Sequence, residues 1–370
     1  MSGSRYRPLA VAAVVAIALA AGAGVAVLSA GGDDGSARTV GSAAATLPMP
    51  PEQAAAQLFL VGFGGTTGSD PGVRRLAGRD WGGVVIERGN ATSAAGVRAL
   101  VAAIRRRARA AGREEPLVAI RQAGGEASAL PRLPPVPQPE QAVAREAALQ
   151  ATAAARALEP LGIDLTLAPV ADLAGAVGPA AMTGFSPDPA IAADLVAAAV
   201  HAYREAGMAS APGSFPGQGA ASGDPRLGPA TVGLDLETLT RADLRPFAAA
   251  AREAPVMQMS DAVYAMWDGV TPATLAPEAY DLLRRGAGFG GVALSGDLTA
   301  VTAVTGGTTA RAAVDALRAG ADLLWVPGDA ADQEAAYEAV LAGLRRDPAL
   351  RARAAEALAR VRLLRERYAR

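Results

Sequence analysis

The sequence predicts an α/β fold of the TIM-barrel type, in which eight parallel strands alternate with helices. From residue 52 onward, short apolar runs recur along the chain, and alanine-rich segments with helical periodicity lie between them. The apolar runs are continuous rather than alternating, as expected for strands that are buried on both faces. Eight such repeats in about three hundred residues match the size of a TIM barrel. A doubly wound sheet is the alternative, because periodicity does not separate the two folds.

The predicted strands follow one another in chain order. They are Leu58–Phe63, Val84–Glu87, Leu117–Ile120, Leu165–Val170, Met208–Ala211, Val256–Met259, Gly291–Ser295 and Leu323–Pro327. The helical segments predicted between them include Gly96–Ala111, Gln141–Ala157, Ile191–Ala206 and Leu239–Glu253.

The end of the chain predicts two amphipathic helices that pack against the barrel. Apolar residues recur at helical spacing in both, which is typical of a helix with one buried face. The first stripe is Tyr337, Val340, Leu341 and Leu344, and the second is Leu350, Ala354, Leu358, Val361, Leu364 and Tyr368.

The N-terminus predicts a segment that is separate from the fold. Arg5 and Arg7 precede Leu9–Ala30, an uncharged run long enough to cross a bilayer. Residues 1–30 are therefore expected to be a signal peptide or a transmembrane anchor, followed by a flexible linker over 31–51 and the barrel over 52–370. Because positive charge stays inside, we expect an extracytoplasmic protein that is membrane-anchored or secreted.

Composition excludes several kinds of chemistry. A formal net charge of -1 argues against nucleic acid as a main partner. The chain has no cysteine and one histidine, so disulfides, zinc–thiolate sites and thiol nucleophiles are excluded. We expect neither a metal nor a cofactor.

The candidate site residues lie where the predicted strands end, because TIM barrels carry their chemistry at the carboxyl ends of the strands. The glycine-rich stretch Gly213–Gly219, which reads GSFPGQG, follows the fifth predicted strand. The polar residues and glycines at these ends include Glu87, Arg88, Arg121, Asp172, Ser214, Ser260, Asp261, Gly296, Asp297 and Asp329.

Five blocks of sequence carry a resemblance to a known family. They read QLFLVGFGG at 57–65, GIDLTLAPVAD at 162–172, FSPDP at 185–189, GFGGVALSGDL at 288–298 and AGADLL at 319–324. In this order and spacing, they resemble family 3 glycoside hydrolases of the β-N-acetylhexosaminidase branch. The N-terminal domain of that family is a TIM-like barrel, which agrees with the strand count.

The resemblance implies retaining hydrolysis of a β-linked amino sugar, with an aspartate as nucleophile and an Asp-His pair as acid and base. This chain departs from the pattern at each of these groups. Gly296 stands at the nucleophile position, and Asp224-Pro-Arg226 replaces Asp-Ser-His, so the histidine is Arg226. These three are vestigial catalytic positions.

The residues that hold the sugar in the family are altered as well. Arg121 stands where the family has an aspartate that holds sugar hydroxyls, and Thr183 stands where it has an arginine. The loop Gly213–Gly219 lacks the lysine and both histidines of the family's Lys-His-Phe-Pro-Gly-His-Gly.

Each retained polar residue has a structural interpretation beside the functional one. Asp297 is favoured as a cap of the next helix over a nucleophile shifted by one residue, since neighbouring strand side chains point to opposite faces. Arg121 is suited to bind an anion but is also expected to pair with Asp172 or Glu87. Asp224 and Arg226 are expected to form a local ion pair on a solvated loop or to contact a ligand.

Three further residues complete the set. Asp172 is expected to bind backbone groups of a loop, and His201 to lie on the surface of a helix. No role is assigned to Asp261.

The sequence therefore predicts a cell-envelope pseudoenzyme that binds an amino-sugar glycan, such as a peptidoglycan fragment, and lacks catalysis. An active glycosidase with substituted residues is the alternative, and new chemistry at Arg121 and Asp297 is a third possibility. The ligand-binding candidates are Arg121, Asp172, Ser214, Asp224, Arg226 and Asp297.

Overall fold

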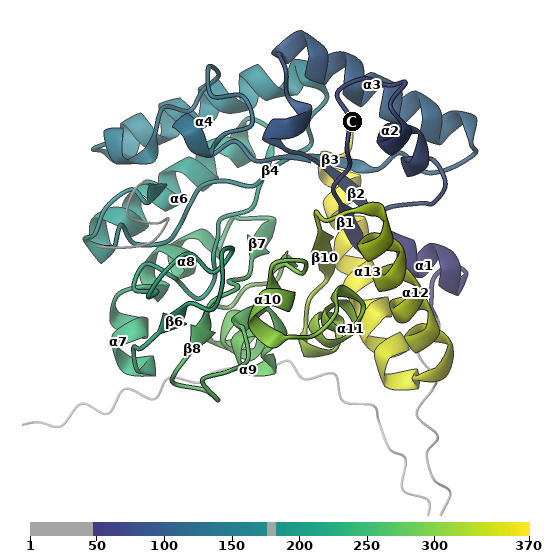
Figure 1. Cartoon of the computed structure of the whole chain (residues 1–370). Coiled ribbons are helices and arrows are strands. Elements are labelled where there is room, and N and C mark those ends of the chain that lie inside the picture. The colour runs from purple at the N-terminus through teal and green to yellow at the C-terminus, as the bar shows by residue number, and fades with distance from the viewer. Residues whose placement is uncertain (1–46, 176–182) are drawn as a thin grey trace, which may run out of the picture. The chain divides into compact units, whose positions relative to one another are not determined.

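A computed structural model describes residues 47–175 and 183–370 (Figure 1). Its main feature is an eight-stranded, all-parallel sheet with helices around it. The strands are β1 (Phe59–Val61), β2 (Gly83–Ile86), β3 (Leu117–Ile120), β4 (Leu165–Thr166), β5 (Ala209–Ser210), β7 (Val256–Gln258), β9 (Val292–Asp297) and β10 (Leu323–Val326). Each overlaps one predicted strand, so the strand prediction is confirmed. Two short strands, β6 (Thr231–Val232) and β8 (Val263–Tyr264), form a separate pair.

The large sheet curves into a TIM-like barrel. Its strand order is β5-β4-β3-β2-β1-β10-β9-β7, which leaves β5 and β7 at the two edges. Beyond the end of β5, the backbone of Phe215 bridges to that of β7: its N–H donates to the carbonyl of Gln258, and its carbonyl accepts from the N–H of Ser260, each at 2.8 Å. These bonds bring the two edges together, so the sheet is a near-closed barrel and not a doubly wound sheet.

Strand side chains are buried on both faces of the barrel wall. Leu60 and Val85 belong to the inner cluster, whereas their neighbours Val61 and Val84 pack outward against the helices. Since successive strand residues point to opposite faces, burial on both sides requires apolar residues at every position. This explains why the strands appear in the sequence as continuous apolar runs.

The helices account for most of the remaining chain. They are α1 (Pro51–Gln57), α2 (Pro71–Leu76), α3 (Ala94–Ala110), α4 (Ala144–Leu158), α6 (Pro189–Glu205), α7 (Leu236–Arg241), α8 (Leu244–Ala250), α9 (Pro277–Asp281), α10 (Val301–Thr305), α11 (Thr309–Ala319), α12 (Ala330–Arg346) and α13 (Pro348–Tyr368). The first three predicted helices match α3, α4 and α6 within a few residues.

The fourth predicted helix, Leu239–Glu253, is wrong as one continuous element. The chain forms two short helices, α7 and α8, with a break at Ala242 and Asp243. Pro246 lies in the first turn of α8, where its missing N–H costs nothing. In a continuous helix its ring would clash with the carbonyl of Ala242, four residues earlier.

The C-terminal helix closes one end of the barrel. Val361, Leu364 and Tyr368 of α13 join the inner cluster of strand side chains. Arg365 donates to the carbonyls of Gly82 and Glu115, which precede β2 and β3. The predicted apolar stripes of α12 and α13 are buried as expected, and α13 covers the end of the barrel where the strands begin. A ligand that enters the barrel is therefore restricted to the opposite end.

The predicted N-terminal segment, residues 1–30, lies outside the described residues. Within the described ranges, no helix has the length and apolar character needed to cross a bilayer. Helix α1 begins at Pro51, the last residue of the predicted linker.

Candidate functional site

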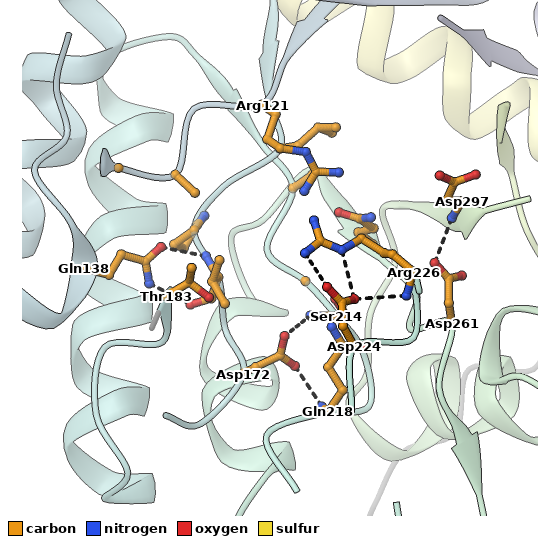
Figure 2. A pocket seen from close by; sticks show the side chains of 18 of the residues that line it. Arg121, Gln138, Asp172, Thr183, Ser214, Gln218, Asp224, Arg226, Asp261 and Asp297 are labelled. Atoms are coloured by element: carbon orange, nitrogen blue, oxygen red, sulfur yellow. Dashed lines mark hydrogen bonds and ion pairs between the residues drawn. The ribbon is translucent and has the colours of Figure 1, made fainter. Parts of the chain in front are cut away.

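A cavity of about 660 Å³ opens where the strands end. This volume lies within the range of small-ligand sites. Its lining comes from the ends of six strands and their loops, and it includes all six predicted ligand-binding residues: Arg121, Asp172, Ser214, Asp224, Arg226 and Asp297 (Figure 2). Gln138, Thr183, Gln218, Asp261 and Trp325 also line it.

The loop Gly213–Gly219 forms one wall of this cavity. Phe215 anchors it from behind, with its ring edge-to-face on Phe247 at a centroid distance of 5.6 Å. Gly217 has a φ of +117°, and a Cβ there would lie 2.7 Å from the Cβ of Asp243, so only glycine fits. The hydroxyl of Tyr264 donates to the carbonyl of Gly217 at 2.7 Å. The glycines and the phenylalanine of the stretch thus fix the shape of the loop.

Asp172 holds the same loop from the other side. Its carboxylate is buried and accepts the backbone N–H of Ser214 at 3.1 Å and that of Gln218 at 2.9 Å (Figure 2). Burial raises the pKa of Asp172 to about 7, although both hydrogen bonds act against the rise. The side chain binds loop backbone and lies at the edge of the cavity.

Asp172→Asn is expected to remove a pH dependence of stability. The folded carboxyl keeps its proton between about pH 4 and about pH 7, where the unfolded carboxyl has lost it. The free energy of unfolding of the wild type should therefore fall with rising pH across this window, by up to about 1.4 kcal/mol per pH unit, and level off above it. Urea unfolding of both proteins at several pH values measures the difference.

Asp194→Asn is the matched control for this prediction, because it removes an exposed carboxylate on α6. Its stability should follow the wild-type pH profile. The same profile in the Asp172→Asn variant would contradict the shifted pKa.

Arg121 points into the cavity from the end of β3 (Figure 2). Its nearest carboxylate is Glu87, with 3.9 Å between Nε and Oε2, and not Asp172. Its guanidinium carbon lies 5.2 Å from the centre of the Trp325 ring, within the range of a cation–π contact. Among the described residues, none accepts a hydrogen bond from this guanidinium. Burial lowers the pKa of Arg121, but an arginine stays charged in any case.

Asp224 and Arg226 form the expected local ion pair at the cavity wall. The carboxylate accepts from Nε of Arg226 at 3.0 Å, from Nη2 at 2.7 Å and from its backbone N–H at 3.0 Å. Burial acts to raise the pKa of Asp224, but the hydrogen bonds and charge of Arg226 outweigh it and lower that pKa. Hydrogen bonding to Asp224 raises the pKa of Arg226. Neither group holds a proton that it can exchange near neutral pH.

Gly296 and Asp261 compete for one volume beside the cavity. A Cβ at position 296 would lie 1.6 Å from Oδ1 of Asp261 and 2.4 Å from its carboxyl carbon. Asp261 comes from the loop after β7, and its Oδ2 accepts the backbone N–H of Asp297 at 3.0 Å. Its Oδ1 is buried and has no hydrogen-bond partner among the described residues. Burial, reinforced by the charge of Asp297, raises the pKa of Asp261 well above its usual value.

Asp297 ends β9 and begins the turn that leads to α10. Its Oδ1 accepts the backbone N–H groups of Thr299 at 2.8 Å and Ala300 at 3.0 Å. Burial raises its pKa, and these two bonds counteract the rise. Its carboxylate therefore organises the turn while it faces the cavity.

Other residues named from the sequence lie elsewhere. His201 is on the surface of α6, where Nδ1 lies 2.9 Å from Glu253. Asp329 accepts two backbone N–H groups at the start of α12. Within residues 47–175 and 183–370, no three His, Cys, Asp or Glu side chains are grouped to hold a metal ion.

Sequence reasoning gave no role to Gln138 or Asp261, which are polar residues of the site. Gln138 lies in a proline-rich stretch, and its side chain donates to the carbonyl of Val170 and accepts from its N–H, at 2.8 and 2.7 Å. Asp261 received no role, although its place after a predicted strand made it a candidate. Its position against Gly296 depends on contacts between distant parts of the chain, which no local pattern contains.

Comparisons with known proteins agree with this barrel. Residues 53–363 match the model of the glycosyl hydrolase family 3 N-terminal domain. A β-hexosaminidase of Pseudomonas aeruginosa is 33% identical over 273 residues, which cover 70% of this chain and 79% of that protein.

Two solved structures show the same fold. The family 3 β-N-acetylglucosaminidase of Paenibacillus sp. has a TM-score of 0.79 and 27% identity, over 86% of this chain and 62% of that one, so this chain spans less than two thirds of it. The β-N-acetylhexosaminidase of Beutenbergia cavernae has a TM-score of 0.75 and 27% identity, over 87% of this chain and 100% of that one. The chain described here therefore belongs to glycoside hydrolase family 3, in its β-N-acetylhexosaminidase-like branch.

Proposed function

We propose that this protein binds an amino-sugar glycan in the barrel cavity and does not cleave ordinary glycosidic bonds in it. The observation that carries this proposal is the pair of Asp224 and Arg226. Both oxygens of the carboxylate are held by one guanidinium, at the position where the resemblance implies the acid and base of the reaction. When a glycosidic bond is cleaved, the leaving group is the hydroxyl oxygen of the next sugar. This alkoxide is a poor leaving group, so its departure needs a proton donor.

Arginine does not supply that proton. The guanidinium stays charged at every accessible pH, and the hydrogen bond to Asp224 raises the pKa of Arg226 further. General acid–base catalysis typically contributes about 10²- to 10⁴-fold in rate, and its loss alone places turnover of a natural glycoside far below that of the family's hydrolases.

A glycan ligand is favoured by the cavity and by the relatives. The lining of the cavity combines apolar side chains such as Leu167 and Val170 with the amide of Gln218 and the charged side chain of Arg121. Sugars present this same mixture of hydroxyls and apolar ring faces. Relatives named β-hexosaminidase and β-N-acetylglucosaminidase act on amino sugars, so peptidoglycan fragments and chitin-type oligosaccharides are the ligand class that we propose.

Calorimetric titration of the full-length protein with N,N′-diacetylchitobiose tests the proposal. We expect saturable binding, and mass spectrometry of the mixture should recover the disaccharide intact. Ser214→Phe, which places a ring in the cavity, should abolish the heat of binding, and a cooperative thermal transition of the free variant should show that it is still folded. Cleavage of the disaccharide by the wild type, or no binding, would contradict the proposal.

We propose in addition that the N-terminal segment keeps the protein at the cell envelope, outside the cytoplasm. The argument is the uncharged run Leu9–Ala30 behind Arg5 and Arg7. Protease added to intact spheroplasts should degrade the folded part, and protection from protease would contradict this location.

A further inference from the structure

The cavity retains a carboxylate where the resemblance implies the nucleophile. Position 296 has lost its side chain, but its volume is not vacant, because the carboxylate of Asp261 fills it. Oδ1 of Asp261 lies 1.6 Å from where a Cβ of residue 296 would be, and Oδ2 lies 2.8 Å from that point. The two oxygens therefore lie close to the volume that an aspartate at 296 would use.

This carboxylate is held in place and is only partly satisfied. Oδ2 accepts the N–H of Asp297, which fixes the group against β9. Oδ1 has no hydrogen-bond partner among the described residues, although Asp261 is only 7% exposed. A buried carboxylate oxygen without a partner is costly, and such groups in native structures call for an explanation. Asp261 borders the cavity, although Oδ1 itself has almost no exposed surface in the free protein, so a ligand would reach this carboxyl through the part of the side chain that lines the cavity.

We propose that Asp261 has replaced residue 296 as the nucleophilic carboxylate of this barrel. This inference rests on the proposed function, because it requires that an amino sugar occupies the cavity. It adds that the bound sugar is exposed to attack at its anomeric carbon, and that, of the groups that act in the reaction itself, the acid and base is the one that is missing.

The chemistry that remains is limited to good leaving groups. An oxygen of Asp261 forms a bond to the anomeric carbon while the bond from that carbon to the leaving group breaks. The leaving group departs with the electron pair of that bond, and a fluoride or an acidic phenolate needs no proton to do so. Water then attacks the glycosyl ester, which releases the sugar and a proton to solvent and restores the carboxylate. An alkoxide leaves too poorly for the first step, which agrees with the proposed lack of cleavage of natural glycans.

The reaction should depend on pH through Asp261 itself. The charged groups that face this carboxyl are Asp297, which raises its pKa together with burial, and Arg121 and Arg226, which oppose the rise. The hydroxyls of Tyr264 and Tyr280 are also within electrostatic range. Only the ionised carboxyl attacks, so the rate of glycosylation should increase with pH above the usual range of an aspartate.

A mechanism-based label tests the inference on the full-length protein. The probe is a 5-fluoro-N-acetyl-β-glucosaminyl fluoride, whose fluoride leaves without an acid and whose ring fluorine slows hydrolysis of the ester. We expect intact-protein mass spectrometry to show one added sugar, peptide mapping to place it on Asp261, and labelling to be faster at alkaline than at acidic pH. Asp261→Asn should not be labelled, whereas Asp194→Asn, which alters an exposed carboxylate on α6, should be labelled like the wild type.

Two results would overturn the inference. One is a label on Asp297, Glu87 or any residue other than Asp261 in the wild type, a result that does not depend on the folding of any variant. The other is no label although N,N′-diacetylchitobiose binds, which would leave the proposed function intact. If the disaccharide does not bind either, the proposed function fails and the inference fails with it.

Discussion

Gly296→Asp is expected to lower the free energy of unfolding by about 3 kcal/mol and to produce no hydrolysis of N,N′-diacetylchitobiose. The resemblance to the family suggests the opposite, because this change recreates the aspartate of the nucleophile motif. The structure explains the difference: the new Cβ would lie 1.6 Å from Oδ1 of Asp261, so Asp261 or the strand must move. Even after such a movement, two carboxylates would share a buried volume, which adds like-charge repulsion to the overpacking.

Urea unfolding and a chitobiose assay measure the two effects. Gly290→Asp is the matched control, since Gly290 is exposed, precedes the same strand and has no heavy atom near its missing Cβ. Its stability should stay within about 0.5 kcal/mol of the wild type. Adding Asp261→Gly to Gly296→Asp should recover much of the lost stability, because it empties the contested volume. Wild-type stability in the single variant would show that the two side chains do not compete.

The barrel was predictable because its signal is local. Each strand is an unbroken apolar run, and each run follows from burial on both faces of the barrel wall. The helix Leu239–Glu253 was wrong for a reason that is also local, because Pro246 restricts where a helix continues.

The site was predictable only in part. Parallel strands bring their carboxyl ends to the same end of a barrel. A barrel fold therefore places Arg121, Asp172 and Asp297 around one cavity. The partner of each side chain did not follow in the same way. Arg121 was expected beside Asp172 or Glu87, and only the structure shows that Glu87 and Trp325 are its neighbours.

The relation of Gly296 to Asp261 illustrates this limit most clearly. In sequence, a glycine at the nucleophile position indicates a lost group, and an aspartate after the sixth strand is one candidate among several without a defined role. In the structure, the carboxylate of Asp261 can occupy its position only because residue 296 is glycine. Any larger side chain at 296 would overlap with that carboxylate. A motif comparison that treats positions independently therefore detects the missing side chain at 296. It does not detect that the carboxylate of Asp261 occupies the same volume.

Arg226→His is expected to give the protein measurable hydrolysis of N,N′-diacetylchitobiose, with a gain of about 10²- to 10⁴-fold over the wild type. Asp224 already accepts the backbone N–H of residue 226 and lies within reach of its side chain, so an imidazole there would have a carboxylate beside it. The imidazole gains and loses a proton near neutral pH, which the guanidinium does not. With Asp261 as nucleophile, no change at Gly296 is needed.

The control for this gain is Arg226→Gln, which removes the same charge and the same ion pair without adding a group that exchanges a proton. Product release measured by mass spectrometry should stay at the wild-type level in the glutamine variant and rise only with histidine. Equal rates in both would show that the arginine merely obstructs the ligand. Combining Arg226→His with Asp261→Asn should remove the gain, because the acid would then act on a bond that no carboxylate attacks. The same loss on combining Arg226→His with Asp194→Asn would trace the effect to stability and not to the carboxylate at the cavity wall.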